Sequence, residues 1–133
     1  MIKLDLTSKA SLIPDHSAIE LEALRRLLAT PCNVPKKGCG VYFLTTPALD
    51  LVKIGQTEDF DNRLRQHASS NPDVFYSAVL DCRGMRVADL RLMGYLEKSF
   101  HEMFEFSRYK GEWFRFTVVL GKLMATCRGI DLW

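Results

Sequence analysis

The sequence lacks several features that would assign a function class directly. No apolar run approaches the ~20 residues that a membrane-spanning helix needs, and the first residues lack the apolar stretch and cleavage site of a secretory signal. The four cysteines include no CxxC pair and have no histidine-rich segment near them, so a structural zinc site is not indicated. These absences favour a cytoplasmic protein with reduced thiols and no membrane contact.

A large excess of charge of one sign is also missing. The formal net charge is +2, so net charge alone does not indicate a nucleic-acid partner. Hydrophobic residues make up 47% of the 133 residues, which suits one domain with a packed core. Basic residues gather at Lys36 and Lys37 and again from Arg108 to Arg115, where aromatic residues alternate with them. A solvated surface and a nucleic-acid-binding surface both explain these clusters.

Turn-forming residues divide the chain into an N-terminal part and a main domain. We expect residues 1–34 to form an arm and an amphipathic helix, for which Ser17 and Glu20 have the spacing of a capping box. Prolines and glycines between residues 30 and 40 end this helix. The main domain is therefore expected to span residues 35–133 as one compact unit.

The main domain is predicted to belong to the α+β class. Its pattern indicates a small three-stranded antiparallel sheet flanked by helices, in addition to the N-terminal helix. The first two strands are separated by a turn and form a hairpin. Strands are expected at residues 40–46, 51–57 and 74–82, a short extended piece at 112–116, and helices at 59–69, 86–107 and 118–127.

An ordered series of motifs runs through this domain. The hairpin contains Gly40-Val41-Tyr42 and Lys53-Ile54-Gly55, Arg63 and His67 lie on the next helix, Glu97 lies on the long helix, and Gly111-Glu112-Trp113-Phe114 closes the series. This series resembles the GIY-YIG nuclease superfamily over about residues 38–116. Within that superfamily it is most similar to small phage and bacterial DNA-binding proteins whose domain has an "EWF" ending.

The resemblance implies an endonuclease that hydrolyses DNA phosphodiester bonds and leaves a 3′-hydroxyl and a 5′-phosphate. It implies one divalent ion, Mg²⁺ or Mn²⁺, bound by Glu97. Two positions depart from the superfamily pattern, because Lys53 replaces the second tyrosine and an asparagine that many members carry is missing, with Glu112 as its candidate replacement. The implied catalytic residues are Tyr42, Lys53, Arg63, His67 and Glu97.

Strand alternation separates Tyr42 from its neighbours. We expect Val41 and Phe43 to face the core and Tyr42 to face a site, with a purely structural tyrosine as the alternative. As a general base Tyr42 must lose a proton whose pKa is ordinarily about 10. A cation about 4 Å away lowers that pKa substantially at an effective dielectric constant near 20. Lys53, across the hairpin, is expected to be that cation.

Spacing on the helices suggests roles for the other candidates. Arg63 and His67 are four residues apart and share one helix face, where Arg63 suits bidentate phosphate binding and His67 suits hydrogen bonding or proton transfer. Glu97 lies at the edge of an apolar stripe and needs a cation, which is either a metal ion or Arg63 or Lys53. We interpret His101, one turn later, as a packing or hydrogen-bonding histidine.

Nucleic acid is the expected partner of this domain. DNA is favoured, with structured RNA as the alternative, and a homodimer or a partner protein would supply sequence specificity because so small a domain has little surface for reading bases. A non-cleaving nucleic-acid-binding module of the same fold is the main alternative to a nuclease. A protein-interaction domain that uses the N-terminal helix is the second. The expected nucleic-acid contacts are Lys36, Lys37, Arg63, Arg108, Lys110 and Trp113.

Overall fold

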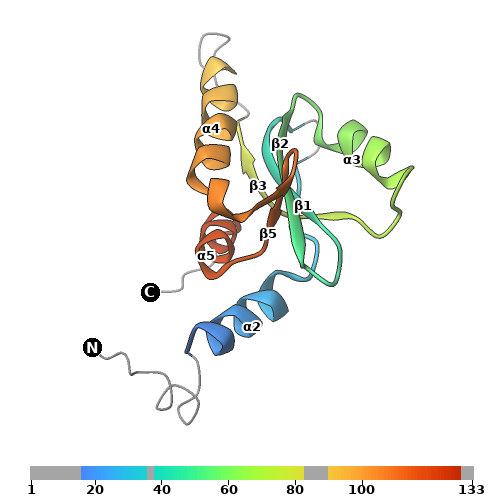
Figure 1. Cartoon of the computed structure of the whole chain (residues 1–133). Helices are drawn as coiled ribbons and strands as arrows, with labels where there is room; N and C mark the ends of the chain where they lie inside the picture. Colours follow the sequence, from blue (N-terminus) through green and yellow to red (C-terminus); the bar gives the residue numbers. More distant parts are fainter. Residues whose placement is uncertain (1–15, 36–37, 83–89, 130–133) are drawn as a thin grey trace.

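The computed structural model describes residues 16–35, 38–82 and 90–129 (Figure 1). The order of helices and strands follows the α+β pattern expected from the sequence. The elements are α2 (His16–Leu28), β1 (Gly40–Thr45), β2 (Leu51–Thr57), α3 (Phe60–Ala68), β3 (Phe75–Asp81), α4 (Leu90–Met103), the short 3-10 helix η2 (Glu105–Ser107), β4 (Arg108–Lys110), β5 (Trp113–Arg115) and α5 (Val118–Cys127).

The sheet is larger than the three strands expected. In the described part of the chain it has five antiparallel strands in the order β3-β1-β2-β5-β4. β4 and β5 contain three residues each, which is too short for the alternation that identifies a strand in a sequence. Pairing with β2, rather than local sequence, makes β5 a strand. The prediction of a three-stranded sheet was therefore wrong in its strand count.

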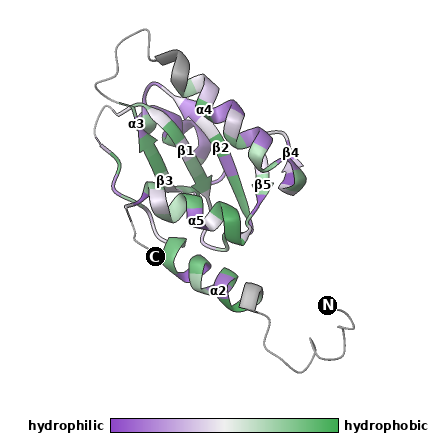
Figure 2. Cartoon of the chain, turned by 90° about the vertical axis from the view of Figure 1, so that its left-hand side faces the viewer, coloured by the Kyte–Doolittle hydropathy of each residue, from purple (hydrophilic) through white to green (hydrophobic). Residues whose placement is uncertain are grey.

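Helices cover both faces of the sheet. Figure 1 shows α3 on the opposite side of the sheet from α4 and α5. Val41 and Phe43 pack in the larger hydrophobic cluster with residues of α2, α4 and α5, as the alternation predicts, whereas Tyr42 and Leu44 pack in a smaller cluster with Phe60 of α3. β1 is consequently buried on both faces. In Figure 2 hydrophobic segments run through β1 and β3, whereas hydrophilic residues recur along α4.

The N-terminal helix packs on the last helix. Leu24 and Leu28 of α2 belong to the larger cluster, and the Ser77 hydroxyl in β3 donates to the Leu28 carbonyl at 2.6 Å. The predicted capping box requires the side chain of Ser17, which lies outside the described part of the structure. The domain boundary between residues 34 and 35 stays a prediction. No helix in the described ranges is both long and apolar enough to cross a membrane.

The boundaries of α3 and α4 determine where the candidate residues lie. The Asp59 side chain accepts from the Asn62 amide at 3.1 Å and caps α3, so the predicted start of this helix is confirmed. The predicted start of the long helix at residue 86 lies outside the described residues. α4 ends at Met103, before the expected residue 107, because η2 continues the chain as a tighter turn.

Candidate functional site

The candidate site forms where β5 stops pairing with β2. The last register pair is Lys53 with Trp113, and within the described residues no further strand pairs with the outer edge of β2. A backbone group from the β4–β5 turn takes the next position, because the Ile54 amide donates to the Glu112 carbonyl at 3.0 Å. This bond holds Glu112 beside the exposed edge of β2.

Side chains of α4 bond to the rest of this edge. The Ile54 carbonyl lies 2.8 Å from Nε2 of His101, and the Gln56 backbone is hydrogen-bonded to the Glu97 carboxylate. A carbonyl can only accept, so Nε2 of His101 carries a proton and Nδ1 is the ring nitrogen that remains for a metal ion. The short length of β5 thus allows α4 to place Glu97 and His101 against β2.

Glu97, His101 and Glu112 form a candidate ligand group. One potential ligand atom from each residue lies within 4.8 Å of the other two. Two carboxylates and an imidazole suit a divalent ion, and a ligating histidine commonly donates its other ring N–H to a carbonyl, as His101 does to Ile54. The expected hydrogen-bonding role of His101 is confirmed, and its position in the ligand group was missed. Its spacing one helical turn after Glu97 was the available signal.

Electrostatics indicate that Glu97 needs a cation. Burial raises the pKa of its carboxyl above the ordinary 4.5, and the negative charge of Glu112 raises it further. The ion pair of Lys53 is with Glu112, at 3.9 Å between Nζ and Oε1, rather than with Glu97 as considered from the sequence. Glu97 is therefore the less compensated of the two carboxylates.

Tyr42 and His67 lie next to each other on the α3 side of the sheet. The Tyr42 side chain is buried, and its hydroxyl oxygen lies 3.1 Å from Nε2 of His67. Gly55 is the register partner of Tyr42, and a Cβ atom there would lie 2.4 Å from the Tyr42 hydroxyl oxygen. The glycine of the second tripeptide therefore provides the space that the tyrosine of the first one occupies.

The pKa of Tyr42 contradicts one expectation. Burial raises it to about 12, Arg63 opposes this increase, and Glu112 and Glu97 add to it. The expectation that Lys53 lowers this pKa toward neutrality was wrong, because burial dominates and the opposing cation is Arg63 of α3. Tyr42 is therefore a protonated phenol at neutral pH.

The pKa of His67 is lowered, whereas that of Tyr42 is raised. Burial lowers the His67 pKa below the ordinary 6.5, and the positive charges of Lys53 and Arg63 lower it further. The imidazole is therefore neutral at pH 7 and able to accept a hydrogen bond from the Tyr42 hydroxyl. These interactions also place the Lys53 and Arg63 charges beside the Tyr42–His67 pair.

The residues expected to contact nucleic acid differ in whether the structure describes them and in how free they are to bind phosphate. Lys36 and Lys37 lie outside the described residues. Arg108 already makes hydrogen bonds at the protein surface, since its guanidinium donates to Glu105 at 2.9 and 3.0 Å and also to the Gly111 carbonyl. A phosphate contact would require Arg108 to release these bonds.

Lys110 is more accessible than Arg108, whereas Trp113 is half-buried. Lys110 is exposed, and the Trp113 ring centroid lies 6.0 Å from Nζ of Lys53. Trp113 is thereby connected to the candidate site through Lys53. Trp113 also packs against the smaller hydrophobic cluster, so it contributes to the core as well.

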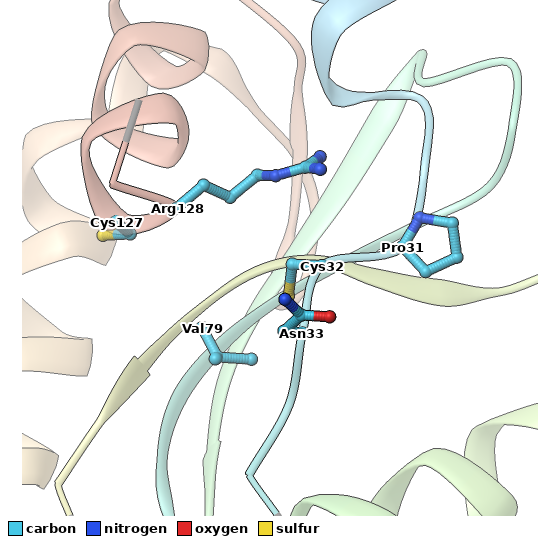
Figure 3. A pocket seen from close by; sticks show the side chains of 6 residues that line it. All are labelled: Pro31, Cys32, Asn33, Val79, Cys127 and Arg128. Atoms are coloured by element: carbon cyan, nitrogen blue, oxygen red, sulfur yellow. The ribbon is translucent and has the colours of Figure 1, made fainter. Parts of the chain in front are cut away.

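A separate pocket of about 290 Å³ lies between the end of α2 and the end of α5 (Figure 3). Its lining includes Cys32, Cys127 and Arg128. Arg128 donates to the Thr30 carbonyl at 3.0 Å, so its guanidinium joins the end of α5 to the end of α2. None of the residues around the edge of β2 lines this pocket, and its interactions are explained by the packing of the two helices.

Comparison with known proteins identifies a related family. A family model described as the T5orf172 domain matches residues 39–128, a range that includes all residues of the candidate site. Comparisons with curated proteins and with solved structures gave no match.

Proposed function

This chain belongs to the family of T5orf172 domains, and from that premise we propose that it is a metal-dependent endonuclease of the GIY-YIG type that hydrolyses DNA phosphodiester bonds. The family is associated with GIY-YIG-like nucleases, which supports a nuclease or DNA-binding role. One observation carries the proposal of cleavage: the Tyr42–His67 pair and the candidate ligand group lie around the same end of β2, with Lys53 interacting with both.

Glu97, His101 and Glu112 would hold the divalent ion. Their donor set fits Mn²⁺ and also accommodates Mg²⁺, which accepts carboxylates and completes its shell with water and phosphate oxygens. When bound there, the ion would supply positive charge for a phosphate oxygen and lower the pKa of a water molecule. Lys53 would release Glu112 as the ion takes over compensation of its charge.

Arg63 and Lys53 would bind and orient the phosphate. A guanidinium remains charged at all relevant pH values and can bind two phosphate oxygens at once. Arg63 acts electrostatically on both Tyr42 and His67, so a phosphate on Arg63 would lie close to the phenol hydroxyl. These two cations would stabilise the additional negative charge that develops on phosphorus during attack by water.

Tyr42 and His67 would move the proton. The water oxygen bonds to phosphorus and the bond from phosphorus to the 3′-oxygen breaks, while the water proton passes to the Tyr42 oxygen. Tyr42 simultaneously donates its own proton to Nε2 of His67, and the leaving oxygen takes a proton from solvent. This relay requires no phenolate in the resting protein, which agrees with the raised pKa of Tyr42.

A plasmid-nicking assay tests the proposal. We expect cleavage in Mg²⁺ or Mn²⁺ that is abolished by a chelator and by Glu97→Gln or Arg63→Ala. Glu102→Gln on α4 and Arg65→Ala on α3 are matched controls, because both residues are exposed on the same helices. Cleavage that survives both site substitutions would contradict the assignment.

A non-cleaving DNA-binding module is the second candidate function. The observation that favours it is the Lys53–Glu112 ion pair, which already compensates one carboxylate of the ligand group. Such a module would bind DNA with a strong dependence on salt concentration and no dependence on chelators. Calorimetric titration with Mn²⁺ separates the candidates, because a nuclease requires a divalent-ion site that Glu97→Gln removes.

A further inference from the structure

A groove of about 480 Å³ lies next to the candidate site. Its lining includes Leu51 of β2, Tyr109 and Lys110 of β4, and Trp113 of β5. Leu51 and Lys53 are two residues apart on β2, and Lys53 is the register partner of Trp113, so these side chains share one face of the sheet. By the same alternation this is the face of Gly55 and its partner Tyr42.

Lys53 connects the groove to the candidate site. Its Nζ lies 6.0 Å from the centroid of the Trp113 ring and 3.9 Å from Oε1 of Glu112. A nucleic-acid strand whose phosphate contacts Lys53 would therefore have a neighbouring nucleotide beside Trp113. This continuity makes the groove an extension of the same binding surface.

The chemistry of the groove suits a nucleobase. Tyr109 is 55% exposed and contributes an aromatic surface together with Trp113, and Asn71 and Asp50 also line the groove and offer hydrogen-bonding groups. The Arg115 guanidinium lies 5.2 Å from the Tyr109 ring centroid, and Lys110 is exposed beside it. Aromatic side chains flanked by cations bind single-stranded nucleic acid by stacking on bases while the cations contact the backbone.

We propose that this groove binds one unstacked nucleobase of the nucleotide next to the scissile phosphate. The proposal rests on the proposed function, which it deepens by naming the substrate class. A paired base inside a duplex is stacked on both sides and cannot enter such a groove without being extruded. The substrate therefore contains a single-stranded or unpaired nucleotide at this position.

Fluorescence of Trp113 provides the test. The chain has two tryptophans, Trp113 and Trp133, so Trp133→Phe leaves Trp113 as the sole tryptophan. In this background with Glu97→Gln to suppress cleavage, the full chain is titrated with a short oligothymidylate, with an abasic strand of the same length, and with the matching duplex. We expect the oligothymidylate alone to quench Trp113 and to bind more tightly than the other two.

Substitution in the groove gives the second measurement. Tyr109→Ala is expected to weaken oligothymidylate binding by about 5- to 150-fold, the range for loss of one base–aromatic stack. Tyr95→Ala is the matched control, because Tyr95 is exposed on α4 and does not line the groove. Equal binding of the oligothymidylate and the abasic strand, or equal effects of the two substitutions, would overturn the proposal.

The outcomes also separate this proposal from the nuclease assignment. If plasmid is nicked but Trp113 does not distinguish the oligothymidylate from the abasic strand, the groove assignment fails and the nuclease assignment stands. If Trp113 distinguishes the two strands but neither plasmid nor a duplex with an unpaired nucleotide is cleaved in Mg²⁺ or Mn²⁺, the nuclease assignment fails, and the groove stands as a base-binding site with no scissile phosphate beside it. Loss of a dimer on Tyr109→Ala, measured by sedimentation, would show that a second copy of the chain occupies the groove and would also overturn the proposal.

Discussion

Tyr42 occupies space that only a glycine at position 55 can leave open. The two residues are register partners, and a Cβ atom on Gly55 would lie 2.4 Å from the Tyr42 hydroxyl oxygen and 2.5 Å from Cζ. Because Tyr42 is also packed against Tyr76, with ring centroids 5.3 Å apart, its ring has little freedom to move away. The two tripeptides of the hairpin are therefore linked by a packing constraint as well as by strand pairing.

Gly55→Ala tests this constraint. The added methyl group is expected to displace the Tyr42 hydroxyl from His67, to lower the free energy of unfolding by about 1–3 kcal/mol as overpacking does, and to remove nicking activity. Gly94→Ala is the control, because its Cβ atom would lie 3.5 Å from the nearest atom of Gln56, at an ordinary contact distance. Denaturant unfolding of both variants would disprove the constraint if their stabilities changed equally.

The pH dependence of cleavage tests the proton relay. His67 must be neutral to accept the Tyr42 proton, and its pKa lies below the ordinary 6.5 because of burial and the charges of Lys53 and Arg63. The rate is therefore expected to rise with pH through an apparent pKa below 6.5 and then to level off.

His67→Gln is the matching substitution for the relay. It should lower the rate by about 10²- to 10⁴-fold and eliminate the rising limb of the pH profile. His16→Gln, at the first residue of α2, is the control and should retain both the rate and the limb. A rising limb that persists in His67→Gln would assign the titration to another group and refute the relay.

The sequence predicted the parts of the fold that depend on local chemistry. Asp59 caps α3 through the Asn62 amide, and Val41 and Phe43 enter the core as strand alternation requires. Alternation does not tell whether the other face of a strand is covered. The burial of Tyr42 beneath α3 was therefore not predictable from the two-residue alternation of the strand alone. The same holds for the increase in the Tyr42 pKa to about 12, which this burial causes.

The arrangement of the candidate ligands depends on contacts between distant residues. Ile54 bonds to His101 and to Glu112, which lie 47 and 58 positions later in the chain. These bonds arise because β5 is three residues long and leaves part of the β2 edge without a strand partner, where other groups can bond to the β2 backbone. No local pattern encodes that length, so the spacing of Glu97 and His101 indicated a shared helix face but not that both residues meet Glu112.

Glu97→Gln tests how strongly the protein needs a cation at this edge. The folded-state pKa of Glu97 is raised, so the protonated form stabilises the fold below pH 4.5, and this stabilisation is lost as pH rises through the folded-state value. Without divalent ions at pH 7, Glu97→Gln is therefore expected to raise the Tm, with a smaller effect at pH 4. Glu102→Gln, on the exposed side of α4, should change the Tm little at either pH. Equal Tm shifts for Glu97→Gln and Glu102→Gln would show that the Glu97 carboxylate does not specifically destabilise the fold.

The choice of metal ion follows from His101. An imidazole ligand favours Mn²⁺ over Mg²⁺, because Mg²⁺ prefers oxygen ligands at small, regular octahedral sites. Wild-type protein is therefore expected to bind Mn²⁺ more tightly than Mg²⁺ in calorimetric titrations, and Mn²⁺ should raise its Tm more at equal concentration.

His101→Gln should reduce this preference while retaining a side-chain N–H that can donate to the Ile54 carbonyl. It would therefore weaken Mn²⁺ binding more than Mg²⁺ binding, and it should leave the Tm without metal close to that of the wild type. Equal losses for both ions would mean that His101 only positions β2 and α4. A lowered Tm without metal, together with an unchanged preference for Mn²⁺, would also show that His101 has only a structural role. Ligation of the ion through Nδ1 predicts instead an unchanged Tm without metal and a reduced preference for Mn²⁺.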